Sequence, residues 1–139
     1  MTTAIDTNIL VCLINSADPL NKAVERTLDT FSTERLMICG AVYAELLAFR
    51  GRTESVLDGF LLDTRIDVDW SISESVWRSA GQAFSKYAAR RRKNTSGHPR
   101  RILTDFIIGA HATGNGYSLL TLDDKIFRPA FPKLKLLTI

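Results

Sequence analysis

The sequence predicts an α/β fold whose strands form one mostly parallel sheet. Short strand-like segments alternate with longer segments of helical periodicity, which is the pattern of parallel strands connected by helices. The chain has 139 residues, a length that suits one core, and its 45% hydrophobic and 24% charged residues are typical of a globular protein. We therefore expect a single domain over residues 1–139.

The first half of the chain has clear signals for helix starts and stops. Asp18 followed by Pro19 predicts a helix start, because the carboxylate can cap free amides and proline fits the first helical position. Gly51 interrupts a run of good helix formers. In chain order we expect a strand at 2–5, a helix at 8–14, a helix from 18 to about 31, a strand at 36–39 and a helix at 41–49.

The second half repeats this alternation. Ser73 is a cap for a long helix in which Trp77, Ala80, Phe84 and Tyr87 recur at helical spacing. A loop with linker character follows at 94–99. Around these features we expect a helix at 54–62, a short strand with alternating apolar residues at 66–70, a buried helix at 102–112, and strands at 118–121 and 134–139.

No segment near the N-terminus is apolar for long enough to span a membrane. The longest apolar run there, residues 9–14, falls far short of the roughly 20 residues that a bilayer requires. The signs of a secretory signal are also missing. Cys12 and Cys39 lie in apolar surroundings without CxxC spacing, which is typical of buried thiols in a reducing compartment. We expect a cytoplasmic protein.

The net charge of +3 comes from one local group of basic residues. Six of the 18 Lys and Arg residues fall within twelve positions, and the rest of the chain has 12 basic against 15 acidic residues. Such a group suits contacts with nucleic-acid phosphates, although a solvated helix end has the same composition. This basic cluster consists of Arg90, Arg91, Arg92, Lys93, Arg100 and Arg101.

Three acidic residues each stand alone in a largely apolar segment. Asp6 is the only charged residue in 1–17, Glu45 the only one in 36–49, and Asp105 the only one in 102–122. Each has a simpler explanation by itself: a helix cap, a solvent-facing position, or a pair with Arg101. Burying an unpaired carboxylate costs several kcal/mol or more, however, and one shared cation would compensate all three.

A fourth acidic feature, Asp123 followed by Asp124, comes directly after the expected strand at 118–121. Ligands of parallel α/β sheets bind beyond the carboxyl ends of the strands, and both Asp6 and Asp123 occupy such ends. Oxygen ligands select Mg²⁺ or Mn²⁺ over zinc. His98 and His111 share no motif with these acids, and we expect His111 to be a surface or satisfied side chain. The sequence predicts one acidic metal site.

Four motifs contain these acids, which are separated by 39, 60 and 18 residues. The motifs are Ile5-Asp6-Thr7-Asn8, Val42-Tyr43-Ala44-Glu45, Leu103-Thr104-Asp105-Phe106-Ile107-Ile108-Gly109-Ala110-His111-Ala112, and Leu120-Thr121-Leu122-Asp123. In order and spacing, over nearly the whole chain, they resemble the motifs of the PIN-domain family, and specifically those of VapC-type toxins of bacterial toxin–antitoxin pairs. The resemblance implies a three-layer α/β/α sandwich with a central, mostly parallel sheet.

The resemblance also implies a site and an activity. The catalytic, metal-binding acids would be Asp6, Glu45, Asp105 and Asp123, with Asp124 as a further candidate ligand and Asn8 and Thr121 as polar supports. The activity would be Mg²⁺-dependent endoribonucleolytic cleavage of RNA that leaves a 5′ phosphate, with Mn²⁺ able to substitute. The basic cluster would hold the RNA backbone. A cognate antitoxin protein and a second copy of the chain, in a homodimer, are the implied partners.

Two alternatives remain open on the sequence. A catalytically silent RNA-binding module could share the PIN fold. A receiver-type phosphoacceptor domain of a signalling protein also has an acidic Mg²⁺ pocket at strand ends, and Thr121 and Lys125 would then take the roles of its threonine and lysine. A receiver, however, needs paired acids after its first strand, where Asp6 stands alone.

Overall fold

The computed structural model of the chain describes residues 1–49, 51–93 and 103–139. In these ranges, five strands form one sheet in the order β3-β2-β1-β4-β5, and each pair of neighbouring strands is parallel. This confirms the predicted α/β class. The strands are β1 (Thr2–Ile5), β2 (Arg35–Cys39), β3 (Ile66–Asp69), β4 (Ser118–Leu120) and β5 (Leu136–Leu137).

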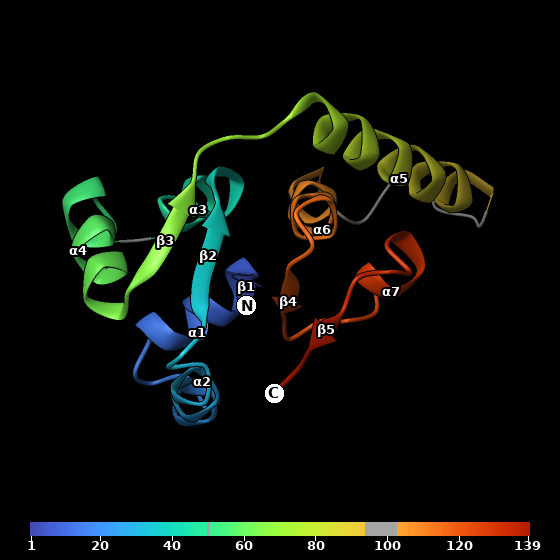
Figure 1. The fold of residues 1–139 in the computed structure, drawn as a ribbon. Coiled ribbons are helices and arrows are strands. Elements are labelled where there is room, and N and C mark those ends of the chain that lie inside the picture. The colour runs from blue at the N-terminus through green and yellow to red at the C-terminus, as the bar shows by residue number, and fades with distance from the viewer. Residues whose placement is uncertain (50, 94–102) are drawn as a thin grey trace.

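Helices pack on both faces of this sheet and form the outer layers of the sandwich. Figure 1 shows α5, α6 and α7 gathered on one side of the molecule and α4 on the other. Within the described ranges, the helices are α1 (Thr7–Ile14), α2 (Asn21–Asp29), α3 (Gly40–Leu46), α4 (Glu54–Thr64), α5 (Glu74–Lys93), α6 (Leu103–Gly114) and α7 (Phe127–Ala130). In that part of the chain, no helix is both long and apolar enough to span a membrane.

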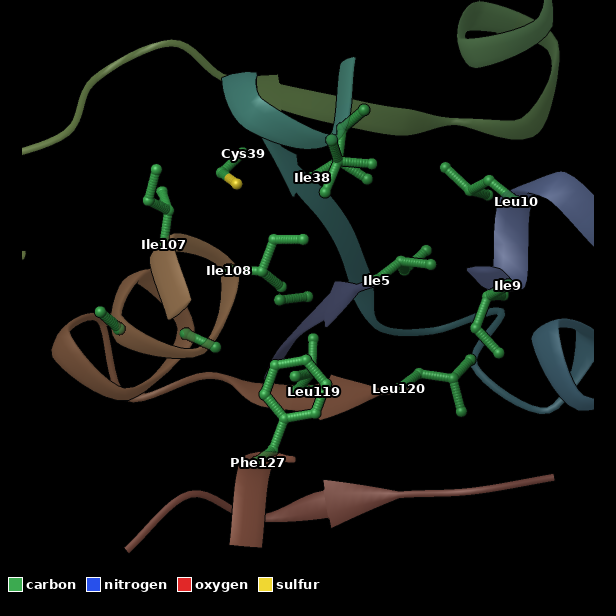
Figure 2. Close-up of a cluster of buried hydrophobic side chains, with 14 of the residues drawn as sticks. Ile5, Ile9, Leu10, Ile38, Cys39, Ile107, Ile108, Leu119, Leu120 and Phe127 are labelled. Atoms are coloured by element: carbon green, nitrogen blue, oxygen red, sulfur yellow. The ribbon is translucent and has the colours of Figure 1, made fainter. Parts of the chain in front are cut away.

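The core lies on both faces of the central strands. Ile5 of β1 and Leu119 of β4 are completely or almost completely buried, as the central strands of a parallel sheet require. Figure 2 shows Ile9 of α1 and Ile108 of α6 approaching these strands from opposite sides. All residues of α6 from 106 to 112 are buried, because this helix lies between the sheet and α5. The apolar sequence of α6 follows from this position.

A glycine in α6 allows one close contact in the core. A Cβ atom on Gly109 would overlap the ring of Phe131, and it would also crowd Phe127. The absence of a side chain therefore lets α6 approach α7 and the segment that follows it. Because α6 begins near Asp105 and α7 follows Asp123, this contact helps to set the distance between two of the predicted site acids.

Several predicted boundaries differ from the structure. Asp18 does accept a hydrogen bond from the amide of Leu20, but it closes a turn, and α2 begins only at Asn21. Helix α3 ends at Leu46, three residues earlier than predicted, because the chain turns before Gly51. Trp70 lies beyond the end of β3, with 66% of its surface exposed. The short helix α7 was missed, since four residues give no periodicity to detect.

The order of the strands creates a crevice beside β1. From β1 the chain continues to β2 on one side, and it later returns to place β4 on the other side. The connections after β1 and β4 therefore diverge at the carboxyl ends of these strands, which is where α/β sheets bind ligands. Asp6 follows β1 directly and Asp123 follows β4 within three residues.

Candidate functional site

The four predicted acids line one open cavity at the carboxyl edge of the sheet. The cavity has a volume of about 430 Å³, and Asp6, Glu45, Asp105 and Asp123 all contribute to its wall. They come from four separate places in the fold: the end of β1, helix α3, the first turn of α6 and the segment after β4. The remainder of the lining is largely apolar and includes Phe49.

Asp6 is the most buried of the four acids. Its side chain is only 4% exposed, accepts a hydrogen bond from the amide of Thr7 at 2.8 Å and thereby caps α1. Burial raises the pKa of Asp6 to about 6, and the nearby charges of Asp105 and Glu45 also raise it, against the lowering effect of its hydrogen bonds. The capping role and the place in the cavity therefore belong to the same side chain.

A polar network holds Asp6 against the end of β4. The buried hydroxyl of Thr121 donates to Oδ2 of Asp6 at 2.7 Å and accepts from the amide of Asp123 at 3.0 Å. The Asn8 side chain completes the network, because its Oδ1 accepts from the amide of Leu122 at 3.2 Å and its Nδ2 lies 3.5 Å from the Thr121 hydroxyl. Asn8 and Thr121 thus lie where the sequence predicted polar supports.

Thr7 has a contact that sequence reasoning missed. Its hydroxyl donates to Oε1 of Glu45 at 2.6 Å, which ties α3 to the start of α1. The available signal was its place between Asp6 and Asn8 in the first motif, but a threonine at the start of a helix has no pattern of its own. The contact means that Asp6 and Glu45 are each fixed by a threonine hydroxyl.

The donor set of the cavity fits a hard divalent cation. All four acidic groups offer carboxylate oxygens, which suit Mg²⁺ or Mn²⁺. Within the described residues, no three Asp, Glu, His or Cys side chains lie close enough together to hold one ion as they stand. Carboxylates repel one another, by about 4 kcal/mol for two unit charges 4 Å apart at an effective dielectric of 20, so bringing them onto one centre requires a cation.

Asp124 is held away from this cavity. Its Oδ2 accepts a hydrogen bond from Nε of Arg128 at 2.7 Å, and this bond lowers the pKa of the Asp124 carboxyl. Among the described residues, Asp124 does not contribute to the cavity wall that Asp123 lines. The structure therefore brings together four of the five candidate acids and places the fifth against α7.

The basic cluster ends α5, the helix that packs along α6. Arg90, Arg92 and Lys93 are exposed, whereas Arg91 is half-buried. Arg100 and Arg101, and the predicted loop at 94–99, lie outside the described residues. Helix α5 runs antiparallel to α6, since Val76 faces Gly114 and the rings of Phe84 and Tyr87 pack on Phe106. The basic end of α5 is thus near the start of α6.

His111 is buried and has a hydrogen-bond partner, so of the two predicted possibilities, a surface or a satisfied side chain, the second is confirmed. Its Nε2 lies 2.9 Å from Oδ2 of Asp69 at the end of β3, and the ring packs edge-on against Tyr117. This hydrogen bond holds the pKa of the Asp69 carboxyl below its usual value. Cys12 and Cys39 are likewise buried, free thiols. Cys12 contributes to the wall of the acidic cavity, whereas His111, Asp69 and Cys39 do not.

The family is decided by the sequence match. Residues 3–132 match the profile of the PIN domain. The chain belongs to the PIN-domain family. This membership removes the receiver-type alternative, and the acids that the PIN motifs contain are the ones that line the cavity. No curated protein matches the chain.

Solved structures of similar fold come from bacterial toxin–antitoxin systems. A chain of VapBC2 from Rickettsia felis, bound to a DNA fragment from its promoter, has a TM-score of 0.73 and 22% identity over 100% of this PIN domain and 99% of that chain. A chain of VapBC-1 from nontypeable Haemophilus influenzae has a TM-score of 0.67 and 26% identity, with 99% and 98% covered. A chain of a toxin–antitoxin complex from Klebsiella pneumoniae has a TM-score of 0.60 and 17% identity over 98% of this PIN domain and 96% of that chain.

Proposed function

We propose that this PIN domain is a metal-dependent endoribonuclease and the toxin of a type II toxin–antitoxin pair. The observation that supports the proposal most strongly is the meeting of four carboxylates, from four separate elements, in one cavity at the carboxyl edge of the sheet. A fold does not assign a function by itself, but an oxygen-only donor set in such a crevice is suited to phosphodiester chemistry.

The reaction that we propose is hydrolysis of an RNA phosphodiester. The oxygen of a water molecule forms a bond to phosphorus, the bond from phosphorus to the 3′ oxygen breaks, and the products have a 5′ phosphate and a 3′ hydroxyl. When bound, one or two Mg²⁺ or Mn²⁺ ions supply Lewis-acid chemistry that activates water and stabilises negative charge on the phosphate oxygens. The four acids Asp6, Glu45, Asp105 and Asp123 would hold the ions.

The chain's own residues would hold two of these acids, Asp6 and Glu45, in place before an ion binds. The Thr121 hydroxyl and the Thr7 amide fix both oxygens of Asp6, and the Thr7 hydroxyl fixes Glu45. A buried Asp6 with a pKa of about 6 is costly to ionise without a counter-charge, so a cation gains affinity from relieving that cost. Acids fixed in this way lose little freedom when an ion binds.

The proposed partners follow from the same reasoning. The similar chains belong to complexes described as VapBC or toxin–antitoxin structures, so a cognate antitoxin protein is the partner that we propose for this chain. A homodimer is the assembly that we propose. The silent RNA-binding module, in contrast, has no observation in its favour, because all four acids are present and line one cavity.

The decisive experiment is cleavage of total RNA by purified, antitoxin-free chain in Mg²⁺, in Mn²⁺ and in EDTA. Asp6→Asn tests the site, and Asp124→Asn is the matched control, because this neighbouring carboxylate pairs with Arg128 instead of lining the cavity. We expect discrete products with 5′ phosphates that require metal and Asp6 but not Asp124. Absence of cleavage by a folded wild-type chain in either metal would contradict the nuclease assignment and favour the silent module.

A further inference from the structure

A second hollow, with one basic wall, lies on the other side of α7 from the acidic cavity. It has a volume of about 230 Å³ and lies between α5 and the segment that begins with α7. We call it the α5–α7 groove. Its α5 wall contains Ser79, Gln82, Lys86 and Arg90, and its other wall contains Pro129 and Phe131. None of the described residues that line it is acidic.

The groove continues along the outer face of α5. A shallower hollow there is lined by Arg78, Ser85 and Lys86, and it shares Gln82 and Lys86 with the α5–α7 groove. Lys86 and Arg90 are one helical turn apart on the same exposed face. In the described part of the chain, neither of them forms an ion pair with a carboxylate, whereas Arg78 is paired with Glu74. Their charges are thus available to an anion.

Helix α7 is the wall that separates the groove from the acidic cavity. Phe127, its first residue, lines the cavity, and Pro129 and Ala130 line the groove. The helix has only four residues, so it is roughly 6 Å long. Figure 1 shows it next to α5 and α6. An RNA strand that leaves the cavity and crosses α7 would enter the groove that Lys86 and Arg90 line.

The charges of the two hollows complement each other along such a path. The cavity has four carboxylates and repels a phosphodiester backbone wherever no cation intervenes. The groove offers two cations and the polar side chains of Ser79 and Gln82 on one wall, and proline and phenylalanine on the other. Proteins that hold single-stranded nucleic acid combine these features: positive charge along the backbone and apolar surface beneath sugars and bases.

We propose that the α5–α7 groove binds the phosphate backbone of the single-stranded RNA next to the bond that is cut. This inference rests on the proposed nuclease function and assigns the backbone contact to Lys86 and Arg90, of which only Arg90 belongs to the basic cluster. Lys86 comes four positions before the cluster begins at Arg90, and one turn of α5 brings the two side chains to the same face. Arg92 and Lys93 do not line the groove in the described part of the chain.

The test is a titration of a labelled single-stranded RNA of about twelve nucleotides, within the range of such sites, into the full-length chain with Asp6→Asn to prevent cutting. The Lys86→Gln, Arg90→Gln pair is compared with Lys22→Gln, Arg26→Gln. The control removes the same residue types at the same spacing from an exposed face of α2. Affinity is measured from low to high salt for each chain.

We expect the groove variant to bind roughly 10- to 30-fold more weakly at 0.1 M salt and to lower the salt slope by about 1.4, since each contact with a single strand contributes about 0.7. The control should change neither quantity. An equal loss of RNA affinity in both variants would show that net charge alone causes the effect and would overturn the proposal. Unchanged RNA affinity in the groove variant would also overturn it. A groove variant that loses self-association but retains its RNA affinity would identify the groove as an interface between copies and also overturn it.

The measurements of RNA binding and RNA cleavage distinguish a failure of the groove proposal from a failure of the nuclease assignment. If the wild-type chain cuts no RNA while the groove variant alone loses affinity, RNA binding by the groove stands and the nuclease assignment fails. If the wild-type chain cuts RNA in the presence of metal while the groove variant binds like the control, the nuclease assignment stands and the groove fails. Sedimentation of each variant without RNA measures its oligomeric state and so shows whether the groove variant has lost self-association.

Discussion

The two edges of the sheet have cavities of similar volume whose acidic residues differ in exposure. The cavity at the carboxyl edge has a volume of about 430 Å³ and the one at the amino edge about 410 Å³, and each is lined by four carboxylates. At the carboxyl edge Asp6 is 4% exposed, whereas at the amino edge the Glu25 side chain is 50% exposed and paired with Lys22. The amino-edge acids are Glu25, Asp29, Glu34 and Asp63.

The number of acids is the same at the two edges, so burial is what decides how strongly a carboxylate needs a counter-charge. Asp29 and Asp63 lie in water at the ends of α2 and α4, where their charges are solvated at little cost. Asp6 lies at the end of a buried central strand, where its charge requires compensation. A cation therefore gains more at the carboxyl edge than at the amino edge.

The largest expected effect is on catalysis. Asp6→Asn keeps the size of the side chain but removes its charge, so we expect RNA cleavage to fall roughly 10²- to 10³-fold, the scale of losing one preorganised electrostatic group. Asp63→Asn makes the same change at the amino edge and should leave the rate unaltered. Cleavage by both variants in one assay makes the comparison, and equal losses would show that the two edges are not distinct.

The next effect is on stability, and it has the opposite sign. The pKa of Asp6 is raised from 3.8 to about 6, so the folded chain binds a proton more tightly than the unfolded chain does. Above pH 6 the ionised carboxylate therefore destabilises the fold. The free-energy cost is about 3 kcal/mol at most, since each unit of pKa difference between the folded and unfolded chain corresponds to about 1.4 kcal/mol.

Asp6→Asn should accordingly stabilise the chain by about 1 to 3 kcal/mol at pH 8 in EDTA. The gain should shrink as the pH falls through 6 and vanish below the unfolded value of 3.8, where both forms are neutral. Urea unfolding at several pH values measures it. A variant that is less stable than the wild type at pH 8 would indicate that the Asp6 charge is already compensated within the chain.

A smaller effect is expected from the threonines that hold the acids. Thr7→Val removes the hydrogen bond to Glu45, and outer contacts of this kind typically contribute about 10- to 100-fold to metal affinity. Thr3→Val is the matched control, because the Thr3 hydroxyl donates to Glu34 at the amino edge at 2.7 Å. We expect weaker Mn²⁺ binding only from Thr7→Val. Equal weakening in both would point to a general loss of structure.

The smallest effect should come from Asp124→Asn. This carboxylate forms an exposed pair with Arg128 one turn away, and such pairs contribute little to stability. We expect an unchanged melting temperature and unchanged Mn²⁺ affinity in calorimetry. A clear loss of affinity would show that Asp124 turns from Arg128 towards the metal, and it would enlarge the proposed ligand set to five acids.

The sequence was most informative where charge and burial conflict. Asp6, Glu45 and Asp105 could be identified because each interrupts an apolar segment, and Asp123 because it follows a strand. The parallel sheet could be predicted because its buried strands alternate with amphipathic helices. In both cases a local pattern reflects a global requirement, namely that apolar residues be buried and that buried charge be compensated.

The missed features are those that depend on distant partners. Thr7 meets Glu45 across 38 positions, and His111 meets Asp69 across 42, so neither pairing leaves a local pattern. Helix α7 is too short for periodicity, although it separates the acidic cavity from the α5–α7 groove. The start of α2 was predicted too early because an aspartate that closes a turn has the same local signature as one that caps a helix.

Calorimetric titration of Mn²⁺ into wild type, Asp6→Asn, Asp105→Asn and Asp63→Asn distinguishes a cation site at the carboxyl edge from one at the amino edge. The acids of the carboxyl edge are proposed to form one site for divalent cations, so we expect wild type and Asp63→Asn to bind alike and both cavity variants to lose that binding. Binding that survives in Asp6→Asn and Asp105→Asn but disappears in Asp63→Asn would place the site at the amino edge and contradict the proposed mechanism.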